Sequence, residues 1–175
     1  MFDCRACSRD FCQKLLNPGG SQSARRRSSV RITSKRNVAT FAPRTSDKVS
    51  ELVAIWSQYV HPRGRDFFQA DDRLQETLST IIKNLNASDD PVLGGSDCVY
   101  WFGPTSKETG TSEQQAILEL AKPGQSSRSP TFVNRLLTFV FATDESFGRL
   151  MKLPKEPFKM SCGDQLCVNI KHISD

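Results

Sequence analysis

The sequence predicts an α+β fold, and three regional patterns lead to this expectation. Residues 1–45 contain cysteines and an excess of basic residues, and residues 18–45 are rich in Ser and Arg, so this stretch is expected to form a mostly disordered basic tail. Residues 46–90 carry apolar side chains at helical spacing, which predicts two amphipathic helices. Residues 94–175 combine short apolar segments with a final group of Cys and His, which predicts a small β-rich domain stabilised by a metal ion.

The positive charge of the chain is concentrated in the tail. The net charge is +5, and residues 1–45 hold ten Lys and Arg against two Asp, whereas the remainder holds fourteen against seventeen acidic residues. A basic segment beside a near-neutral fold indicates contact with a polyanion or recognition by a nuclear import receptor, although a solvated linker has the same composition. Arg25, Arg26 and Arg27, followed by two serines, are the candidate import signal.

The sequence also bears on the cellular compartment. No run of about 18 apolar residues is present, and the N-terminal residues lack the apolar stretch of a secretory signal. We therefore expect no membrane association and a nuclear or otherwise intracellular location. The six cysteines are then expected to stay reduced and to bind metal, whereas a secreted protein would use them as a disulfide framework.

The two helices of residues 46–90 have recognisable boundaries. The first is expected to begin at Ser46 or Asp47, either of which is a suitable N-cap, and to end before Pro62. The second is expected to begin near Asp71, with Gln75 placed for a capping box. The apolar positions that support them are Val49, Leu52, Val53, Trp56, Tyr59 and Val60 in the first helix, and Leu74, Leu78, Ile81, Ile82 and Leu85 in the second.

Short β segments and a third helix are expected after the polar turn region 84–95. Cys98–Phe102 and Ala116–Leu120 have the composition of strands, and a stretch rich in Gly and Thr separates them. Ser129 and Pro130 are placed as the N-cap and first residue of a helix, which is expected to end at residues 144–148. The apolar face of this helix would consist of Phe132, Leu136, Phe139 and Val140. A basic, extended connector, residues 149–159, is expected to follow.

The C-terminal stretch, here called the knuckle, has the spacing of metal ligands. Cys162, Cys167 and His172 form a Cys-x4-Cys-x4-His pattern, and Gly163 allows the backbone to turn. Two thiolates and an imidazole are three of the four ligands that a structural zinc ion prefers. The sequence therefore predicts a structural Zn²⁺ ion whose fourth ligand comes from another part of the chain. The alternative interpretation is that two cysteines and a histidine lie near one another by chance.

A candidate second metal site lies in the tail. Cys4, Cys7 and Cys12, with Phe11 between them, have the spacing with which a two-Cys two-His zinc finger begins. The paired histidines of such a finger do not follow. The site is therefore incomplete and would need a distant ligand such as His61, and a reduced cysteine cluster is the alternative interpretation.

Four features follow one another in the second half of the chain: Cys98 before Trp101 and Gly103, a β region, a short helix with Arg135, and the knuckle. Over about residues 94–175, this order resembles the His-Cys box branch of the ββα-metal, or His-Me finger, homing endonucleases. The resemblance implies a ββα-metal-like domain stapled by one structural zinc ion. It also implies the ligands of that ion, which would be Cys98, Cys162, Cys167 and His172.

The chain departs from the resembled pattern where the catalytic groups would be. In those nucleases a histidine two residues before the first knuckle cysteine activates water, and an asparagine on a later helix holds magnesium. Met160 occupies the first of these positions, and a thioether accepts no proton at neutral pH. Only three residues follow His172, so no counterpart of the magnesium-binding asparagine is expected. Ile170 occupies a position where the resembled family has proline. The resemblance thus implies a degenerate member without a catalytic base.

The resemblance also implies that the β sheet lies along the DNA major groove. Acidic neighbours leave the β-rich domain only weakly attractive to a polyanion, so the tail would supply the long-range attraction. DNA is accordingly the expected partner. The candidate nucleic-acid contacts are Lys107, Lys122 and Arg128 in the domain and Arg25, Arg26 and Arg27 in the tail.

Three functions are open at this point. The first is a zinc-stabilised DNA-binding protein that resembles a homing endonuclease without its catalytic base, and hence no enzyme. The second is an active HNH or His-Me-type endonuclease that cleaves DNA with a divalent metal. The third is a zinc-folded interaction module for a protein partner or a second copy of the chain. Its candidate anchors are Tyr59, Phe67 and Phe68 beside Arg63 and Arg65.

Overall fold

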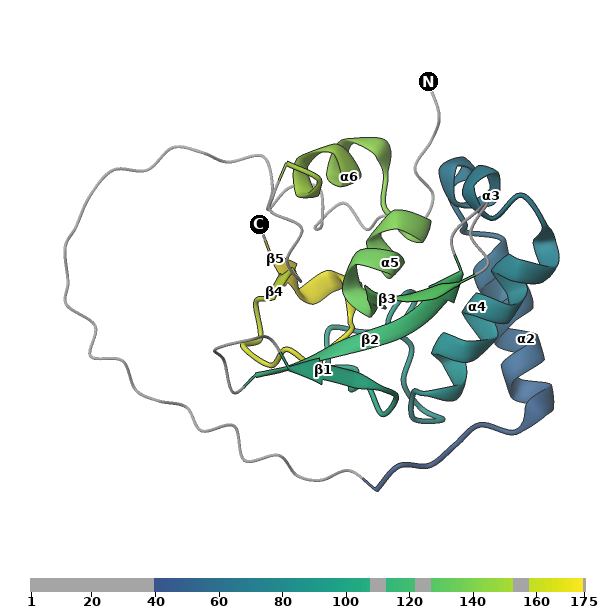
Figure 1. The fold of residues 1–175 in the computed structure, drawn as a ribbon. Helices are drawn as coiled ribbons and strands as arrows, with labels where there is room; N and C mark the ends of the chain where they lie inside the picture. The colour runs from purple at the N-terminus through teal and green to yellow at the C-terminus, as the bar shows by residue number, and fades with distance from the viewer. Residues whose placement is uncertain (1–39, 108–112, 122–126, 153–157, 175) are drawn as a thin grey trace, which may run out of the picture. The chain divides into compact units, whose positions relative to one another are not determined.

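The computed structural model describes residues 40–107, 113–121, 127–152 and 158–174, without the side chain of Asp71. Residues Phe41–Asp175 form one compact unit. As expected, this unit is mixed α and β, with five α-helices and small antiparallel sheets in the described ranges (Figure 1). Most of the predicted tail lies outside the described residues. No described helix is long and apolar enough to cross a membrane.

Helix α2 (Ser46–Ser57) confirms the first predicted helix with different ends. Thr45 is the N-cap, because it is the last residue with an extended backbone, and its hydroxyl accepts a hydrogen bond from the Lys48 amide at 3.4 Å. The expected caps, Ser46 and Asp47, are already helical. The helix buries Val49, Val53 and Trp56, and it ends before Tyr59 and Val60.

The first predicted helix does end before Pro62, but Pro62 also begins a short helix that was not predicted. Helix α3 (Pro62–Phe68) has proline at its first position, where an N–H would have no partner within the helix. His61 is the N-cap, and its Nδ1 accepts a hydrogen bond from the Arg63 amide at 3.3 Å. Gln69 ends the helix with a left-handed backbone, at φ 56°.

Helix α4 (Asp71–Lys83) confirms the second predicted helix, and it packs against α2 and α3. The expected capping box with Gln75 does not form, because the N-cap is Ala70, which has no side-chain acceptor. Leu85 lies beyond the last helical residue, yet its side chain is fully buried. The turn after α4 therefore belongs to the core.

The three-stranded sheet has the antiparallel order β1-β2-β3, from β1 (Thr105–Lys107), β2 (Gln114–Ala121) and β3 (Arg128–Phe132). Strand β2 corresponds to the predicted segment Ala116–Leu120. It pairs Ala116 with Thr105 and Ile117 with Phe132. Its alternate side chains Ala116, Leu118 and Leu120 are buried, which places this face of the strand in the core.

The expected strand Cys98–Phe102 is not a strand. Its one β-bridge to the described residues joins Tyr100 to Cys167 of the knuckle and not to the three-stranded sheet. Val99 and Trp101 are buried as a strand would have them, but the Trp101 indole N–H donates to the carbonyl of Pro104 at 2.8 Å. This bond lies in the turn that leads the chain into β1. The segment itself pairs with the knuckle and not with the three-stranded sheet.

The predicted third helix exists, with both ends misplaced. Ser129 and Pro130 belong to strand β3, and helix α5 runs from Val133 to Phe141. Residues 144–148 do not simply close it, because they begin helix α6 (Asp144–Leu150), which the Thr143 hydroxyl caps. Of the predicted connector 149–159, the first two residues end α6, and residues 153–157 lie outside the described part.

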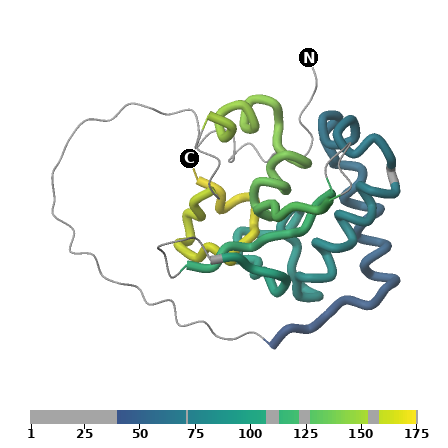
Figure 2. The backbone as a smooth tube through the Cα atoms, in the orientation of Figure 1, coloured from purple at the N-terminus to yellow at the C-terminus, as the bar shows by residue number. Residues whose placement is uncertain are grey.

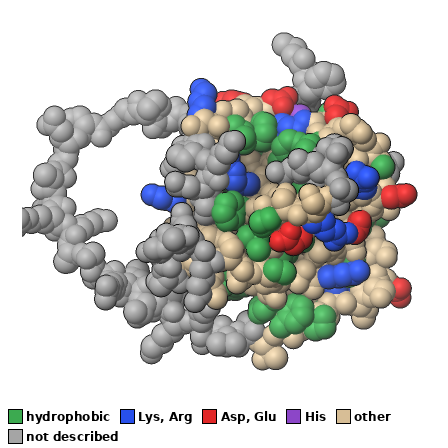
Figure 3. Space-filling model, viewed as in Figure 1, with side chains coloured by type: hydrophobic (Ala, Val, Ile, Leu, Met, Phe, Trp, Pro, Cys, Tyr) green, Lys and Arg blue, Asp and Glu red, His purple; other side chains and the backbone are tan. Residues whose placement is uncertain are grey.

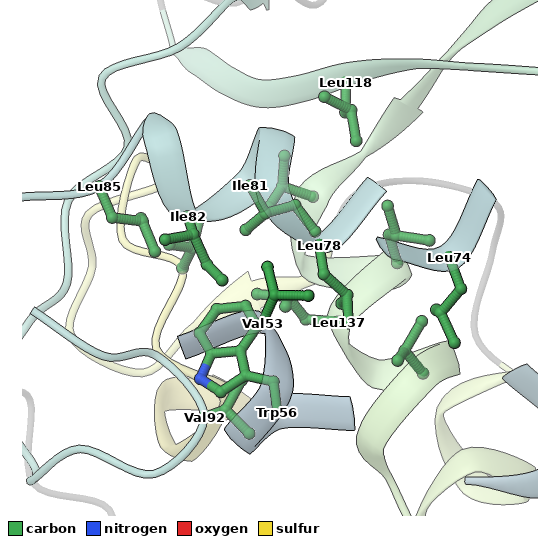
Figure 4. Close-up of a cluster of buried hydrophobic side chains, with 14 of the residues drawn as sticks. Val53, Trp56, Leu74, Leu78, Ile81, Ile82, Leu85, Val92, Leu118 and Leu137 are labelled. Carbon is green, nitrogen blue, oxygen red and sulfur yellow. The ribbon is translucent and has the colours of Figure 1, made fainter. Parts of the chain in front are cut away.

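One core is shared by the helices and the sheet. Figure 4 shows Trp56 of α2, Leu78 and Ile81 of α4, Leu118 of β2 and Leu137 of α5 in a single cluster. All five side chains are at most 5% exposed. Burial of such side chains is the main stabilising contribution to a fold of this size.

Residues 158–174, which contain the knuckle, pack against the rest of the fold (yellow in Figure 2). Strand β4 (Lys159–Met160) pairs with β5 (Ile173–Ser174) in a small antiparallel sheet, and a 3-10 helix, η1 (Ile170–His172), precedes β5. Val168 is fully buried in the core, and η1 contacts α5. The position of the knuckle is thus set by packing as well as by its short strands.

Candidate metal centre

The structure brings together the four side chains that the sequence and the resemblance single out. The ligand atoms of Cys98, Cys162, Cys167 and His172 all lie within 4.8 Å of one another. Four ligands around a zinc ion, with bonds of about 2.0–2.3 Å, stand about 3.5–3.8 Å apart. The group therefore needs only a small contraction to surround an ion, and its thiol and imidazole donors suit a soft or borderline metal. These four side chains can hold a metal ion.

Two turns of the knuckle place its cysteines. Gly163 has φ +79°, and its amide donates to the Met160 carbonyl at 2.9 Å, which turns the chain at Cys162. The side-chain carboxylate of Asp164 accepts a hydrogen bond from the Leu166 amide at 3.0 Å. The backbone carbonyl of Asp164 accepts one from the Cys167 amide at 3.1 Å. These local hydrogen bonds direct both sulfurs to one side of the turn.

His172 is oriented by its second ring nitrogen. Nε2 lies 2.7 Å from the carbonyl of Ser96, which can only accept, so Nε2 carries the proton. The unprotonated Nδ1 then faces the thiols, at 3.4 Å from the Cys167 Sγ and 3.7 Å from the Cys98 Sγ. An imidazole held in this way by a backbone carbonyl is typical of a metal ligand.

Cys98 reaches the site because the knuckle pairs with residues 99–101. The Val168 amide donates to the Val99 carbonyl at 2.8 Å, and the Trp101 amide donates to the Leu166 carbonyl at 2.9 Å. These two bonds flank the Tyr100–Cys167 bridge. The fourth ligand is therefore delivered by backbone pairing between segments more than 60 residues apart.

The three thiols differ in exposure, and two of them have a raised pKa. Cys162 is exposed, Cys98 is intermediate and Cys167 is buried. Burial raises the pKa of Cys167 to about 12, and burial is also the main reason that the pKa of Cys98 is raised. The pKa of the neighbouring Tyr100 rises to about 12, chiefly through burial and then through the negative charge of Cys98. An incoming metal ion must therefore displace protons from thiols.

No second histidine accompanies these ligands in the described residues. Met160, at the position where the resembled nucleases have histidine, is buried, and its sulfur lies 3.9 Å from the Asn134 amide nitrogen. The chain has two histidines, of which His172 belongs to the cluster. The other, His61, caps α3 and lies 3.5 Å from the Asp144 carboxylate. The arrangement can bind an ion but offers no free imidazole for acid–base chemistry.

The candidate nucleic-acid contacts are only partly described. Arg128 is exposed and forms an ion pair with Glu76 at 3.1 Å, and Lys107 ends β1 opposite Gln114. Lys122, Arg25, Arg26 and Arg27 lie outside the described residues, as do Cys4, Cys7 and Cys12. The described residues hold thirteen Lys and Arg against fourteen Asp and Glu, and Figure 3 shows both signs interspersed on one face. This part of the chain carries no excess positive charge.

The candidate anchors of an interaction module are mostly structural. Phe68 is 3% exposed, and the Phe67 ring packs edge-on against Phe139 of α5. Arg63 donates to the carbonyl of Phe139 at 2.8 Å and pairs with Asp144 at 2.8 Å. Tyr59, at 37% exposure, is the large apolar anchor that faces solvent. Two of the five residues, Arg63 and Phe67, therefore join α3 to α5.

Sequence reasoning missed the residues that support the ligands. Asn169 caps η1, and it is 1% exposed. An asparagine two residues after a ligand cysteine is a recognisable cap for a turn, so this signal was present in the sequence. The role of Ser96 rests on its backbone carbonyl, which no residue type reveals.

Comparison with known proteins adds no relative. No protein-family model, curated protein or solved structure matches this chain.

Proposed function

We propose that the four-residue cluster binds one structural Zn²⁺ and that the protein binds duplex DNA without cutting it. The observation that carries the first part is the convergence of three sulfurs and one imidazole nitrogen within 4.8 Å. Structural zinc sites use four protein ligands, whereas catalytic sites keep one position open. Four ligands from the chain therefore support a structural role, in which binding can contribute of order 10 kcal/mol to folding.

The DNA-binding part of the proposal rests on charge and on the resemblance of residues 94–175 to homing endonucleases. The described unit is near neutral, while residues 1–45 carry ten Lys and Arg against two Asp. Attraction to phosphates would then come mainly from the tail. The thioether of Met160 supports binding without hydrolysis, because it replaces the group that would accept a proton from water.

Native mass spectrometry of the full chain tests the zinc site. We expect one zinc per chain, retained in Cys4→Ser and lost in Cys162→Ser. The Cys4→Ser variant is the matched control, since it removes a tail cysteine by the same substitution. A wild-type protein that takes up no zinc would disprove the structural zinc centre, and a second zinc that Cys4→Ser removes would assign metal to the tail.

Fluorescence anisotropy with a labelled DNA duplex tests the second part. We expect binding by the zinc-loaded full chain at low salt that weakens steeply as salt rises. Replacement of Arg25, Arg26 and Arg27 by Gln should weaken binding and reduce the salt slope by up to about three. Absence of binding at low salt would end the DNA proposal. Supercoiled plasmid should stay uncut with Mg²⁺ or Mn²⁺, and nicking that follows the protein through purification would favour the endonuclease.

A further inference from the structure

A row of hydrogen bonds joins the knuckle to residues 91–101, and none of these bonds involves a sulfur. Three are between backbones: Trp101 amide to Leu166 carbonyl at 2.9 Å, Val168 amide to Val99 carbonyl at 2.8 Å, and Ile170 amide to Pro91 carbonyl at 3.1 Å. The two segments are thus docked by contacts that are separate from the metal ligands. We call this row the seam.

Asn169 lies in the middle of the seam and uses both ends of its side-chain amide. Its Nδ2 donates to the carbonyls of Gly95 and Asp97, at 3.1 and 2.7 Å. Its Oδ1 accepts from the Lys171 amide at 3.0 Å, inside the turn that carries His172. The side chain is 1% exposed, so water does not compete for these bonds.

The loop that receives these bonds has little else to hold it. Gly95, Ser96 and Asp97 are all exposed, so no side-chain packing fixes their positions. Within the described part of the chain, their backbone carbonyls accept two hydrogen bonds from Asn169 and one from the His172 ring. This loop leads directly into Cys98. Its conformation therefore orients the His172 ring through the Ser96 carbonyl. Together with the backbone pairing of residues 99–101, it also sets where the Cys98 sulfur lies.

We propose that Asn169 is the positioning residue of this site and that its hydrogen bonds assemble the ligands before an ion binds. One carboxamide fixes the loop before Cys98 and the turn before His172, so two ligands that are 74 positions apart are set by a single side chain. The proposal rests on the proposed zinc site for the identity of the ion only. It differs from the behaviour of small zinc fingers, in which the ion itself drives folding.

Hydrogen exchange of the metal-free, reduced full chain tests this docking without any ion. In the wild type we expect slow exchange for the seam amides of Trp101 and Val168. The Asn169→Asp variant keeps the side-chain oxygen that accepts from the Lys171 amide. It replaces the NH2 group, which donates to the carbonyls of Gly95 and Asp97, with an oxygen that cannot donate. It should speed exchange of the seam amides at least tenfold and leave the β2 amide of Leu118 unchanged.

The matched control is Asn84→Asp, which removes an amide-to-carbonyl bond of 2.8 Å, to Thr80, at the end of α4. It should leave the seam amides protected. Asn169→Ser removes both donors without adding a charge, and it replaces the aspartate variant if that variant does not fold. Seam amides that exchange freely in the metal-free wild type, or that stay protected in the Asn169 variants, would overturn the proposal.

Zinc affinity, measured by competition with a chromogenic chelator, gives the second readout. Replacement of a residue that orients metal ligands typically lowers metal affinity about 10–100-fold. We expect the zinc affinity of Asn169→Asp to fall by about that factor. Asn84→Asp should stay within about threefold of the wild type. An equal affinity in Asn169→Asp and wild type would also refute the role of Asn169. If the wild type binds no zinc, the proposed function fails, and the exchange measurement still decides the docking.

Discussion

The Nδ1 of His172 lies 3.4 Å from the sulfur of Cys167, while the opposite ring nitrogen, Nε2, donates to the carbonyl of Ser96 at 2.7 Å. The ring is thus fixed at both nitrogens. We expect His172→Ala to weaken zinc binding by at least about a hundredfold, because it removes one of four ligands. Ser96→Ala is the control, since Ser96 contributes only its backbone. Chelator competition measures both, and equal affinities for the two variants would exclude His172 as a ligand.

Zinc affinity should rise with pH. The pKa values of Cys98 and Cys167 are raised, that of Cys167 to about 12, so both thiols hold protons at neutral pH in the metal-free protein. Zinc binds thiolates, and each binding event displaces those protons. Each displaced proton lowers the dissociation constant about tenfold per pH unit, so these two thiols alone should lower it about a hundredfold per unit between pH 6 and pH 8. A dissociation constant that does not change with pH would mean that these thiols are not ligands.

Alkylation of the metal-free protein should follow the exposure of the thiols. We expect iodoacetamide to modify Cys162 first, because it is exposed, and Cys167 last, because burial both shields it and raises its pKa. Saturating zinc should slow the reaction at all three. Peptide mapping by mass spectrometry gives the order, and early modification of Cys167 would contradict the burial described above.

Two glycines should respond in opposite ways to alanine. A Cβ at Gly103 would lie 2.5 Å from the Trp101 ring and 2.8 Å from the Asn84 side chain, so we expect Gly103→Ala to destabilise the fold by about 1–3 kcal/mol. A Cβ at Gly148, within α6, meets no atom within 4 Å. There alanine should stabilise by about 0.5–1 kcal/mol through its helix propensity. Urea unfolding measures both, and a neutral Gly103→Ala would show that the turn relaxes.

Helical periodicity located most of the helices, whereas single capping residues misplaced their ends. The spacing from Val49 to Trp56 marked α2 correctly, because these side chains share one buried face. The helix that starts at Pro62 was not predicted, because proline is equally typical of the end of one helix and the start of the next, and the His61 cap shows itself only in the structure. Ser129 and Pro130 look like a helix start, yet pairing with β2 holds them in a strand. Tertiary contacts decided both cases.

The four members of the cluster were predictable, whereas among their supports only the Asn169 cap has a signal in the sequence. Spacing alone gave Cys162, Cys167 and His172, since ligands close in sequence imply a turn between them. Cys98 followed only from the resemblance, because nothing in its neighbourhood encodes pairing with the knuckle. The strand expected at Cys98–Phe102 shows the same limit: Val99 and Trp101 have the correct alternation, but the partner of the segment is Leu166–Val168 rather than the sheet.

Cys98 and His172, whose side chains meet at 3.7 Å, are separated by 74 positions in the sequence. Closure of so long a loop has an entropic cost before any contact offsets it, which slows folding. An ion that binds only after the four side chains have come together adds its stabilisation after this barrier. Stabilisation that arises after the barrier slows unfolding and leaves the folding rate nearly unchanged. An ion held between these two residues would therefore lengthen the lifetime of the native state rather than hasten its formation.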